Sequence, residues 1–332
     1  MDYSNFISRL LEGDPRAAAR LITFVENNIE AAEEIINSIY EFTGNAYILG
    51  ITGAPGAGKS TFISTLTKIY VEQGKKVGII CVDPTSPLTG GALLGDRIRM
   101  KQNFSLNNVF IRSMANRGQL GGLARATEDV IKILDAYGCD IIIVETVGVG
   151  QSEVDIFKSA QTVIVLLVPG LGDDIQAVKA GIMEVVDIFV VNKMDFPRAD
   201  KKVAEIKQML EFRNNYKYDS KELRKKYAKI ELWTPKITKV NSKSGENFSD
   251  LLELIKEHEI FLKDSGVIVN YMKNRITNET LQILKFKLTK RVEELLNSDK
   301  EIEQYINQAI QKSLDPYSMA NLIIKNLGLE KP

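Results

Sequence analysis

Residues 53–60 read GAPGAGKS, and this segment constrains the fold more than any other part of the chain. It follows an apolar run at 47–51 and precedes residues 61–66, whose apolar side chains have helical spacing. A strand, a glycine-rich loop and a helix in this order are the context of a phosphate-binding loop. The glycines let backbone N–H groups converge on phosphate oxygens at the positive end of a helix. The sequence therefore predicts a nucleotide-binding domain built around this strand.

The last residues of the loop carry its chemistry. Lys59 would reach the β- and γ-phosphates of a nucleotide, which makes it a predicted catalytic residue. The hydroxyl of Ser60 would bind Mg²⁺. The predicted phosphate contacts are Gly53, Ala54, Pro55, Gly56, Ala57, Gly58, Lys59, Ser60 and Thr61.

A second motif, Asn192-Lys193-Met194-Asp195, follows an apolar segment at 188–191 and indicates which base is bound. The Asp195 carboxylate can accept hydrogen bonds from the ring N–H and the exocyclic amine of guanine, whereas adenine offers no matching pair of donors. A wrong base leaves this acceptor unpaired. In comparable sites this selects the correct ligand over the wrong one by roughly 10⁴-fold or more. The two motifs together predict a GTPase that binds GTP and GDP, with Asn192, Lys193 and Asp195 at the base.

Apolar segments rich in β-branched residues alternate with helical segments through the middle of the chain. Fully apolar strands separated by helices imply a mostly parallel sheet covered on both faces, with ligands beyond the carboxyl ends of the strands. We expect an α/β fold of the P-loop NTPase class, with an N-terminal helical extension at 1–44, a GTPase domain at 45–248 and a C-terminal helical region at 249–332. The expected strands are 47–52, 77–82, 109–112, 141–145, 162–168, 188–191 and 236–240.

The composition favours an ordinary globular protein. Lys plus Arg and Asp plus Glu both number 43, so no charge bias favours a nucleic acid or a membrane surface as partner. The N-terminus has no signal-peptide pattern, and no apolar run is long enough to span a bilayer. With two cysteines and one histidine, Cys81 and Cys139 are expected in the core rather than in a disulfide or zinc site. A cytoplasmic location fits these features best.

Acidic residues follow two other predicted strands, at the edge where the phosphate loop lies. Asp83 can bind Mg²⁺ or one of its waters, or it can cap a turn. Asp96 lies in a glycine-rich segment that could reorder around the γ-phosphate, or it is a surface residue. Glu145 and Gly148 occupy positions where GTPases usually place D-x-x-G, with the carboxylate near Mg²⁺ and the glycine N–H on the γ-phosphate. Gln151 could orient the attacking water, which makes it the second predicted catalytic residue.

A base-side loop is predicted after the last strand, at Asn241, Ser242 and Lys243. GTPases carry S-A-K or S-A-L at this point, and a backbone N–H of that loop contacts the guanine carbonyl. Asn241 replaces the usual serine, which a backbone contact tolerates.

Two further segments have two interpretations each. The lysine- and arginine-rich stretch at 201–229 is either a docking face for a partner or anionic ligand, or a solvated pair of helices. The glycine- and arginine-containing stretch at 117–125 is either a second mobile loop or the entry to a helix.

Several motifs outside the phosphate loop resemble the methylmalonyl-CoA mutase-associated GTPase family, called MeaB or ArgK. They are V-D-P-T-S at 82–86, T-G-G-A-L-L-G-D-R-I-R-M at 89–100, L-G-G-L-A-R-A-T at 120–127 and E-T-V-G-V-G-Q-S-E at 145–153. The last is highly specific, because generic GTPases do not use glutamate there with this continuation. The similarity spans nearly the whole chain and is strongest from 48 to 195.

The resemblance implies a GTPase chaperone that gates adenosylcobalamin loading of an acyl-CoA mutase and protects that mutase from inactivation. It implies a homodimer to which C-terminal helices contribute. By position in the motifs, Ser60, Asp83, Asp96 and Glu145 become the Mg²⁺ set. The segment 169–179 resembles the family's partner-responsive third switch, or it is an ordinary loop between a strand and a helix.

Three other functions share parts of this pattern. Nickel-insertion GTPases use the same scaffold but carry a Cys/His cluster, which two isolated cysteines and the single His258 do not supply. A kinase linked to basic amino-acid transport would need an acceptor pocket and a base, and no distinct motif supplies them. A binding module that holds GTP without turnover would differ from a GTPase in releasing no phosphate, with or without the mutase.

Overall fold

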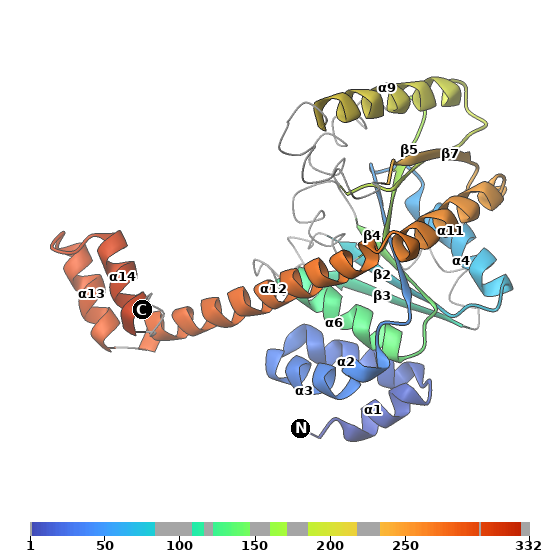
Figure 1. The fold of residues 1–332 in the computed structure, drawn as a ribbon. Helices are drawn as coiled ribbons and strands as arrows, with labels where there is room; N and C mark the ends of the chain where they lie inside the picture. The colour runs from blue at the N-terminus through green and yellow to red at the C-terminus, as the bar shows by residue number, and fades with distance from the viewer. Residues whose placement is uncertain are drawn as a thin grey trace. The chain divides into compact units, whose positions relative to one another are not determined.

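A single parallel sheet forms the core of the part of the chain that ends at Thr277 (Figure 1). The computed structural model of the chain describes residues 2–83, 108–115, 122–146, 160–170, 185–217, 233–298 and 300–326. Within these ranges, seven strands pair in the order β3-β2-β4-β1-β5-β6-β7, all in parallel. The predicted α/β architecture of the P-loop NTPase class is confirmed. The strands are β1 (Tyr47–Gly53), β2 (Val77–Asp83), β3 (Val109–Ala115), β4 (Ile141–Thr146), β5 (Thr162–Leu167), β6 (Ile188–Asn192) and β7 (Lys236–Val240).

Helices cover both faces of the sheet, because successive strand residues point to opposite sides and both sides are apolar. Leu49 and Ile51 of β1 pack in one core cluster with α4 and α11, whereas Ile48 packs in the other with α6 and the N-terminal helices. A third cluster joins β5 and β6 to α9. The helices are α1 (Ser4–Leu11), α2 (Pro15–Asn27), α3 (Ile29–Ile39), the 3₁₀ turn η1 (Tyr40–Phe42), α4 (Lys59–Glu72), α6 (Gly122–Ala136), α9 (Ala199–Lys217), α11 (Phe248–Asp264), α12 (Val267–Ser298), α13 (Lys300–Ile310) and α14 (Pro316–Asn326).

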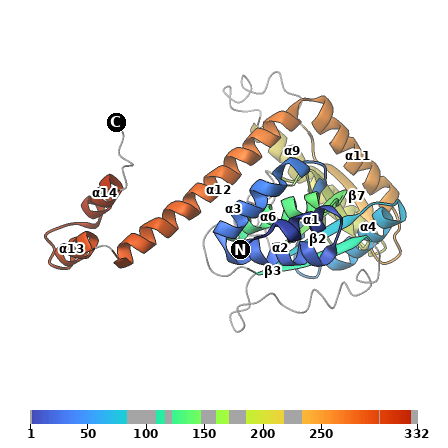
Figure 2. The same cartoon turned by 90° about the horizontal axis from the view of Figure 1, so that it is seen from below.

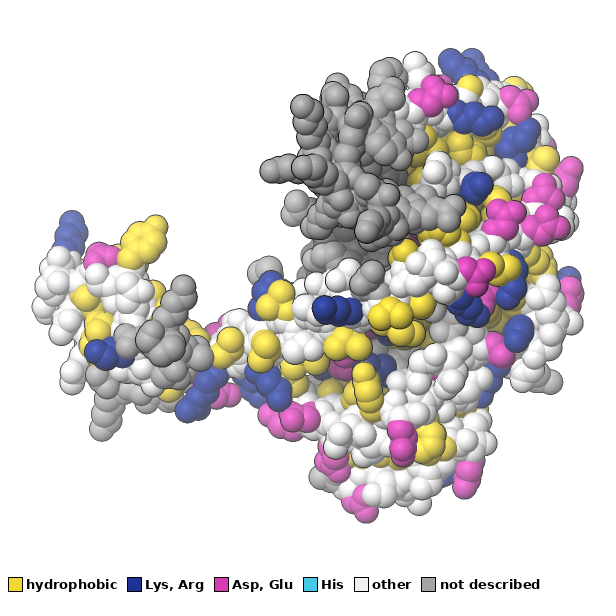
Figure 3. All heavy atoms as spheres, viewed as in Figure 1, with side chains coloured by type: hydrophobic (Ala, Val, Ile, Leu, Met, Phe, Trp, Pro, Cys, Tyr) yellow, Lys and Arg dark blue, Asp and Glu magenta, His cyan; other side chains and the backbone are white. Residues whose placement is uncertain are grey.

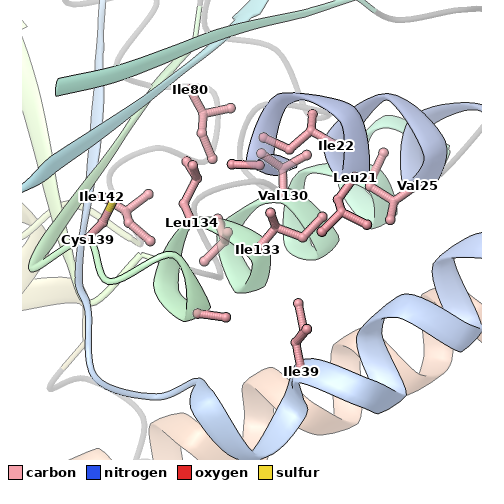
Figure 4. Close-up of a cluster of buried hydrophobic side chains, with 14 of the residues drawn as sticks. Leu21, Ile22, Val25, Ile39, Ile80, Val130, Ile133, Leu134, Cys139 and Ile142 are labelled. Atoms are coloured by element: carbon pink, nitrogen blue, oxygen red, sulfur yellow. The ribbon is translucent and has the colours of Figure 1, made fainter. Parts of the chain in front are cut away.

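The N-terminal helices form an additional layer over α6. Seen from below, α1, α2 and α3 lie in front of the strands (Figure 2). Leu21, Ile22 and Val25 of α2 are fully buried in the same cluster as Val130 and Ile133 of α6 (Figure 4). The predicted helical N-terminal extension is therefore packed as part of the core.

A buried carboxylate fixes the chain where this layer leads into β1. Asp135, near the end of α6, accepts backbone N–H bonds from Gly44 at 2.6 Å, Asn45 at 3.2 Å and Ala46 at 3.0 Å. Bonds from backbone N–H groups satisfy the charge of this nearly buried side chain. The strand that leads to the phosphate loop thus begins from a defined position.

The C-terminal region is helical, as predicted. The chain divides into two compact units within α12, between Thr277 and Asn278. In the first unit, α11 packs on the sheet, and Arg275 of α12 pairs with Glu128 of α6 at 3.2 Å. In the second unit, α13 and α14 pack together. The division into 1–44, 45–248 and 249–332 stays a prediction. None of the described helices is long and apolar enough to cross a membrane.

A buried histidine connects α11 to the amino ends of the strands. Nδ1 of His258 lies 2.8 Å from the Thr162 hydroxyl. Nε2 of the same ring lies 3.4 Å from a carboxylate oxygen of Asp187. The hydroxyl of Tyr47 lies 2.6 Å from that of Thr162. A neutral ring protonated on Nε2 satisfies both neighbours of the imidazole. Burial lowers the pKa of His258 from 6.5 to about 4, even though the Asp187 carboxylate favours the charged ring.

We predict that His258 makes the stability of the protein depend on pH between about 6.5 and 4. Above this range the imidazole is neutral in both the folded and the unfolded chain. As the pH falls, the unfolded chain binds the proton first, so the free energy of unfolding decreases by up to about 3 kcal/mol. Denaturant unfolding at pH 7 and pH 4.5 would measure this loss.

His258→Gln supplies the control, since its amide can donate and accept in place but does not titrate. Other carboxylates also lose stability in acid, so the informative quantity is the difference in pH dependence between the parent protein and His258→Gln. Equal pH dependence in the two proteins would contradict the role of His258.

Candidate functional site

The phosphate loop connects β1 to α4 at the carboxyl edge of the sheet. Gly53 and Gly58 have φ angles of +151° and +89°, which residues with a Cβ rarely adopt. A Cβ on Gly53 would lie 2.3 Å from the carbonyl oxygen of Leu166, and one on Gly58 would lie 2.6 Å from the side-chain nitrogen of Asn192. Only glycine fits at these two positions, so the loop has the cradle shape that the motif predicts.

Lys59 begins α4 and turns its side chain back over the loop. Its ammonium donates to the carbonyl oxygens of Gly53 at 2.7 Å and Ala54 at 3.3 Å, and the residue is 7% exposed. Ser60 follows it in the first turn of the helix, and Thr61 is exposed one position further. The positive charge is thus held at the centre of the predicted phosphate site.

Asn192 joins the phosphate loop to the predicted base loop. This buried side chain ends β6, and its amide nitrogen donates to the carbonyl oxygen of Ala57 at 2.8 Å. Its amide oxygen accepts from the Ser242 hydroxyl at 2.7 Å, and from the backbone N–H groups of Ser242 at 3.2 Å and Lys193 at 2.8 Å. The structure therefore gives Asn192 an architectural role that connects loops after β1, β6 and β7.

The predicted base-side residues come together after β6 and β7, which are neighbouring strands. Lys193 has a φ of +58°, an uncommon conformation for a non-glycine residue that often marks a functional site. Its ammonium lies 5.6 Å from the centre of the half-exposed Phe196 ring. Asp195 is exposed, and its carboxylate accepts a hydrogen bond from the side chain of Asn241 at 3.0 Å. Two loops that are far apart in sequence thus share one surface.

The predicted magnesium ligands lie partly within the described residues. Glu145 is 3% exposed on β4, in register with Ile51 of β1, and the Cys81 thiol lies 3.8 Å from its carboxylate. Asp83 ends β2, the strand beside β4. Carboxylate and hydroxyl oxygens are the ligands that Mg²⁺ prefers, so the chemistry of Glu145 and Ser60 suits such a site, and their role as magnesium ligands stays a prediction.

Some predicted residues lie outside the part of the chain that the structure describes. They are Asp96, Gly148, Gln151, the side chain of Asp83, and the segment 171–179 of the predicted third switch.

Two further residues contact the site. Thr65 of α4 donates its hydroxyl to the carbonyl oxygen of Ser242 at 2.7 Å, which ties the base loop to the helix of the phosphate loop. Phe196 lies against Lys193. Neither residue belongs to a motif, and the Thr65 contact joins positions far apart in sequence.

Residues 18–297 match the model of the family described as methylmalonyl-CoA mutase-associated GTPase MeaB. The chain belongs to the MeaB family. It is a P-loop GTPase, and so a hydrolase, as the two nucleotide motifs predict.

Relatives of this MeaB-family chain cover most of its length. A provisionally named GTPase of Pyrococcus horikoshii is 50% identical over 97% of both chains. The GTPase ArgK of Escherichia coli is 35% identical over 78% of this chain and 77% of its own. The mouse mitochondrial methylmalonic aciduria type A homolog is 37% identical over 66% of this chain and 50% of its own. A crystal structure titled LAO/AO transport system kinase covers 98% of this chain and 97% of its own, with a TM-score of 0.66. At 22% identity, this last likeness shows the fold alone.

We predict that Lys59→Ala lowers GTP hydrolysis at least about 100-fold and weakens GTP binding, because the charge facing the β- and γ-phosphates is lost. Phosphate release and titration with a fluorescent GTP analogue would measure the two effects. Lys68→Ala is the matched control, since Lys68 lies on the same helix with its side chain 67% exposed. Hydrolysis close to the parent rate in Lys59→Ala would contradict the phosphate-loop assignment.

Proposed function

We propose that this chain is a Mg²⁺-dependent GTPase that gates adenosylcobalamin loading of an acyl-CoA mutase of the methylmalonyl-CoA mutase type, and protects that mutase. The observation that carries the proposal is the family match over residues 18–297, because the family is described by its association with that mutase. The name of the mouse relative, which refers to methylmalonic aciduria, supports the same partner class.

The phosphate loop and the base loop would hold GTP between them. The N–H groups of residues 53–61 and the Lys59 ammonium would bind the phosphates, while Lys193, Asp195 and the loop at 241–243 would bind guanine. In this structure Lys59 donates to loop carbonyls, so nucleotide binding would redirect its ammonium to phosphate oxygens. Asn192 would keep the two halves of the site in register through Ala57 and Ser242.

Ser60, Asp83, Asp96 and Glu145 are the residues that would hold Mg²⁺. When bound, Mg²⁺ would neutralise negative charge on the phosphate oxygens as the terminal phosphate leaves. Gly148 would sense that phosphate through its N–H, and Gln151 would orient the attacking water. Loss of the phosphate would release the loop that follows β4, which is the switch by which the chain would report hydrolysis to its partner.

The main test measures GTP hydrolysis by the purified protein, alone and with the adenosylcobalamin-dependent acyl-CoA mutase of the same organism. We predict that the mutase raises the rate of GTP hydrolysis at least about tenfold, since a catalytic group supplied in trans can raise this rate by far more. We also predict that the mutase keeps its activity longer when the GTPase and GTP are present. Glu145→Gln changes a predicted magnesium ligand, and Lys179→Ala changes the last residue of the segment that resembles the third switch, so each should abolish the stimulation.

Glu72→Gln is the control, because Glu72 is an exposed carboxylate at the far end of α4. The absence of both stimulation and a complex would remove the mutase as partner. GTP hydrolysis by the protein alone would still support the GTPase assignment, whereas no hydrolysis under either condition would contradict it.

A homodimer is the second part of the proposal. Exposed apolar side chains recur three and four residues apart within each unit's part of α12, and Figure 3 shows apolar side chains along this helix. Exposed apolar rows of this kind are typical of protein–protein contacts. Among the described side chains of α12, the large exposed apolar ones are Val269, Met272, Ile276, Leu281, Leu284 and Leu288.

We predict that the protein has the mass of a dimer in solution, measured by light scattering over a concentration series. The double variant Leu284→Lys/Leu288→Lys should raise the dissociation constant of the dimer at least about tenfold, because two charges would enter the contact. Thr289→Lys is the control, since Thr289 is exposed on α12 next to Leu288 but is not apolar. A monomeric parent protein, or a double variant that dimerises normally, would contradict the use of α12.

A further inference from the structure

The side chain of Asn241 holds the base loop in a closed turn. Its oxygen accepts backbone N–H bonds from Lys243 at 3.1 Å and Ser244 at 3.4 Å. The backbone of Asn241 pairs with Glu246 across the same turn. Since an amide oxygen only accepts, these two donors fix which way round the amide of Asn241 lies. Its NH₂ group must then point away from the turn.

That NH₂ group donates to the carboxylate of Asp195 at 3.0 Å. The two residues follow neighbouring strands, Asp195 after β6 and Asn241 after β7. One oxygen of the carboxylate is therefore held by a neutral donor that cannot lose its proton. A carboxylate on an exposed loop otherwise rotates among several orientations, and fixing it reduces the entropy lost on binding.

Guanine and hypoxanthine differ at the group that such a carboxylate reads. Both bases carry the ring N–H and the carbonyl, but only guanine carries the exocyclic amine. Reading the amine as well as the ring N–H requires both carboxylate oxygens to lie in the plane of the base. A carboxylate that turns freely recognises the second donor poorly.

We propose that Asn241 is a positioning residue that aligns the Asp195 carboxylate with the guanine edge, and so sets the preference for guanine over bases without the exocyclic amine. This inference rests on the proposed role of Asp195 as the guanine-reading residue. It assigns the side chain of Asn241 a function of its own, in addition to the backbone contact expected of the base loop.

Thr65 contacts the base loop without contacting Asn241 or Asp195 in any described hydrogen bond. A change at Thr65 can therefore disturb the backbone contact to the base carbonyl separately from the positioning of Asp195. The hydroxyl of Thr65 donates to the carbonyl oxygen of Ser242 at 2.7 Å. Thr65→Val would remove this bond in a side chain of similar shape and loosen the loop that faces the base carbonyl. Because guanine and hypoxanthine share that carbonyl, this change weakens binding of both bases equally.

The experiment measures dissociation constants for GDP and IDP by calorimetry, at constant Mg²⁺ and salt, for the parent protein and four variants, and for ADP with the parent protein. Asn241→Asp keeps an oxygen for the Lys243 and Ser244 N–H groups but places a second carboxylate against Asp195. Asn241→Ala removes both the turn contacts and the donor. Asp195→Asn marks the complete loss of the carboxylate, and Thr65→Val is the matched control.

We expect Asn241→Asp to weaken GDP binding at least about tenfold and to lower the preference for GDP over IDP at least about threefold. Asn241→Ala should change the preference in the same direction, toward the value for Asp195→Asn. Thr65→Val should weaken GDP and IDP equally, with the preference unchanged. If the Asn241 variants only damaged the loop, they would weaken GDP and IDP equally, as Thr65→Val does.

An unchanged GDP/IDP preference in both Asn241 variants, with a clear preference for GDP over ADP in the parent, would overturn the role of Asn241 alone. A parent protein that binds ADP as tightly as GDP would instead overturn the guanine-reading role of Asp195, and with it this inference.

Discussion

The site depends on one buried amide, that of Asn192. It bonds to Ala57 of the phosphate loop and to Ser242 of the base loop, at the end of the strand that carries the Lys193 and Asp195 motif. A buried amide whose oxygen and nitrogen are both hydrogen-bonded is held in place, since displacing it would leave polar atoms unpaired in a buried environment. The contacts of Asn192 belong to loops that follow β1, β6 and β7. These bonds therefore hold the phosphate and base regions at a fixed distance from each other.

The packing below this edge explains why the loops can be held so closely. β1, β4, β5 and β6 are buried on both faces, and helices cover both sides of the sheet. The N-terminal layer reaches the same core through α6, and Asp135 sets the point where β1 begins. A close-packed core of this kind transmits small displacements instead of absorbing them. The N-terminal extension therefore supports the position of the phosphate loop through this shared core.

Most of the fold could be predicted from the sequence, because each strand is a short apolar run and each nucleotide motif directly follows one. The side-chain contacts could not be predicted in the same way. Thr65 meets Ser242, and Asn241 meets Asp195, across long separations in sequence, and no local pattern marks these pairs. Asn241 illustrates the limit well, since in the motif it is only a replacement for serine.

The basic stretch at 201–229 shows a similar limit. Its first part is α9, where Lys202 is 4% exposed and lies 3.5 Å from the Glu205 carboxylate. From the composition alone, Lys202 would be included among the charges of a docking face. In the structure, the aliphatic part of its side chain is buried. Residues 218–232 lie outside the described part of the chain, so the docking hypothesis for them stays untested.

The polar side chains at the two edges of the sheet differ in how far they bond to one another, and this difference explains where a ligand can bind. At the amino edge, Asp187, His258 and Thr162 satisfy one another beneath Trp233, whose ring lies 4.6 Å from the imidazole. At the carboxyl edge, Asp195 is exposed and Lys193 adopts a left-handed backbone conformation. Backbone strain persists only where the surrounding structure holds it. Asn192 and the turn closed by Asn241 supply that support, so this edge can present Lys193 and the exposed Asp195 carboxylate to a ligand.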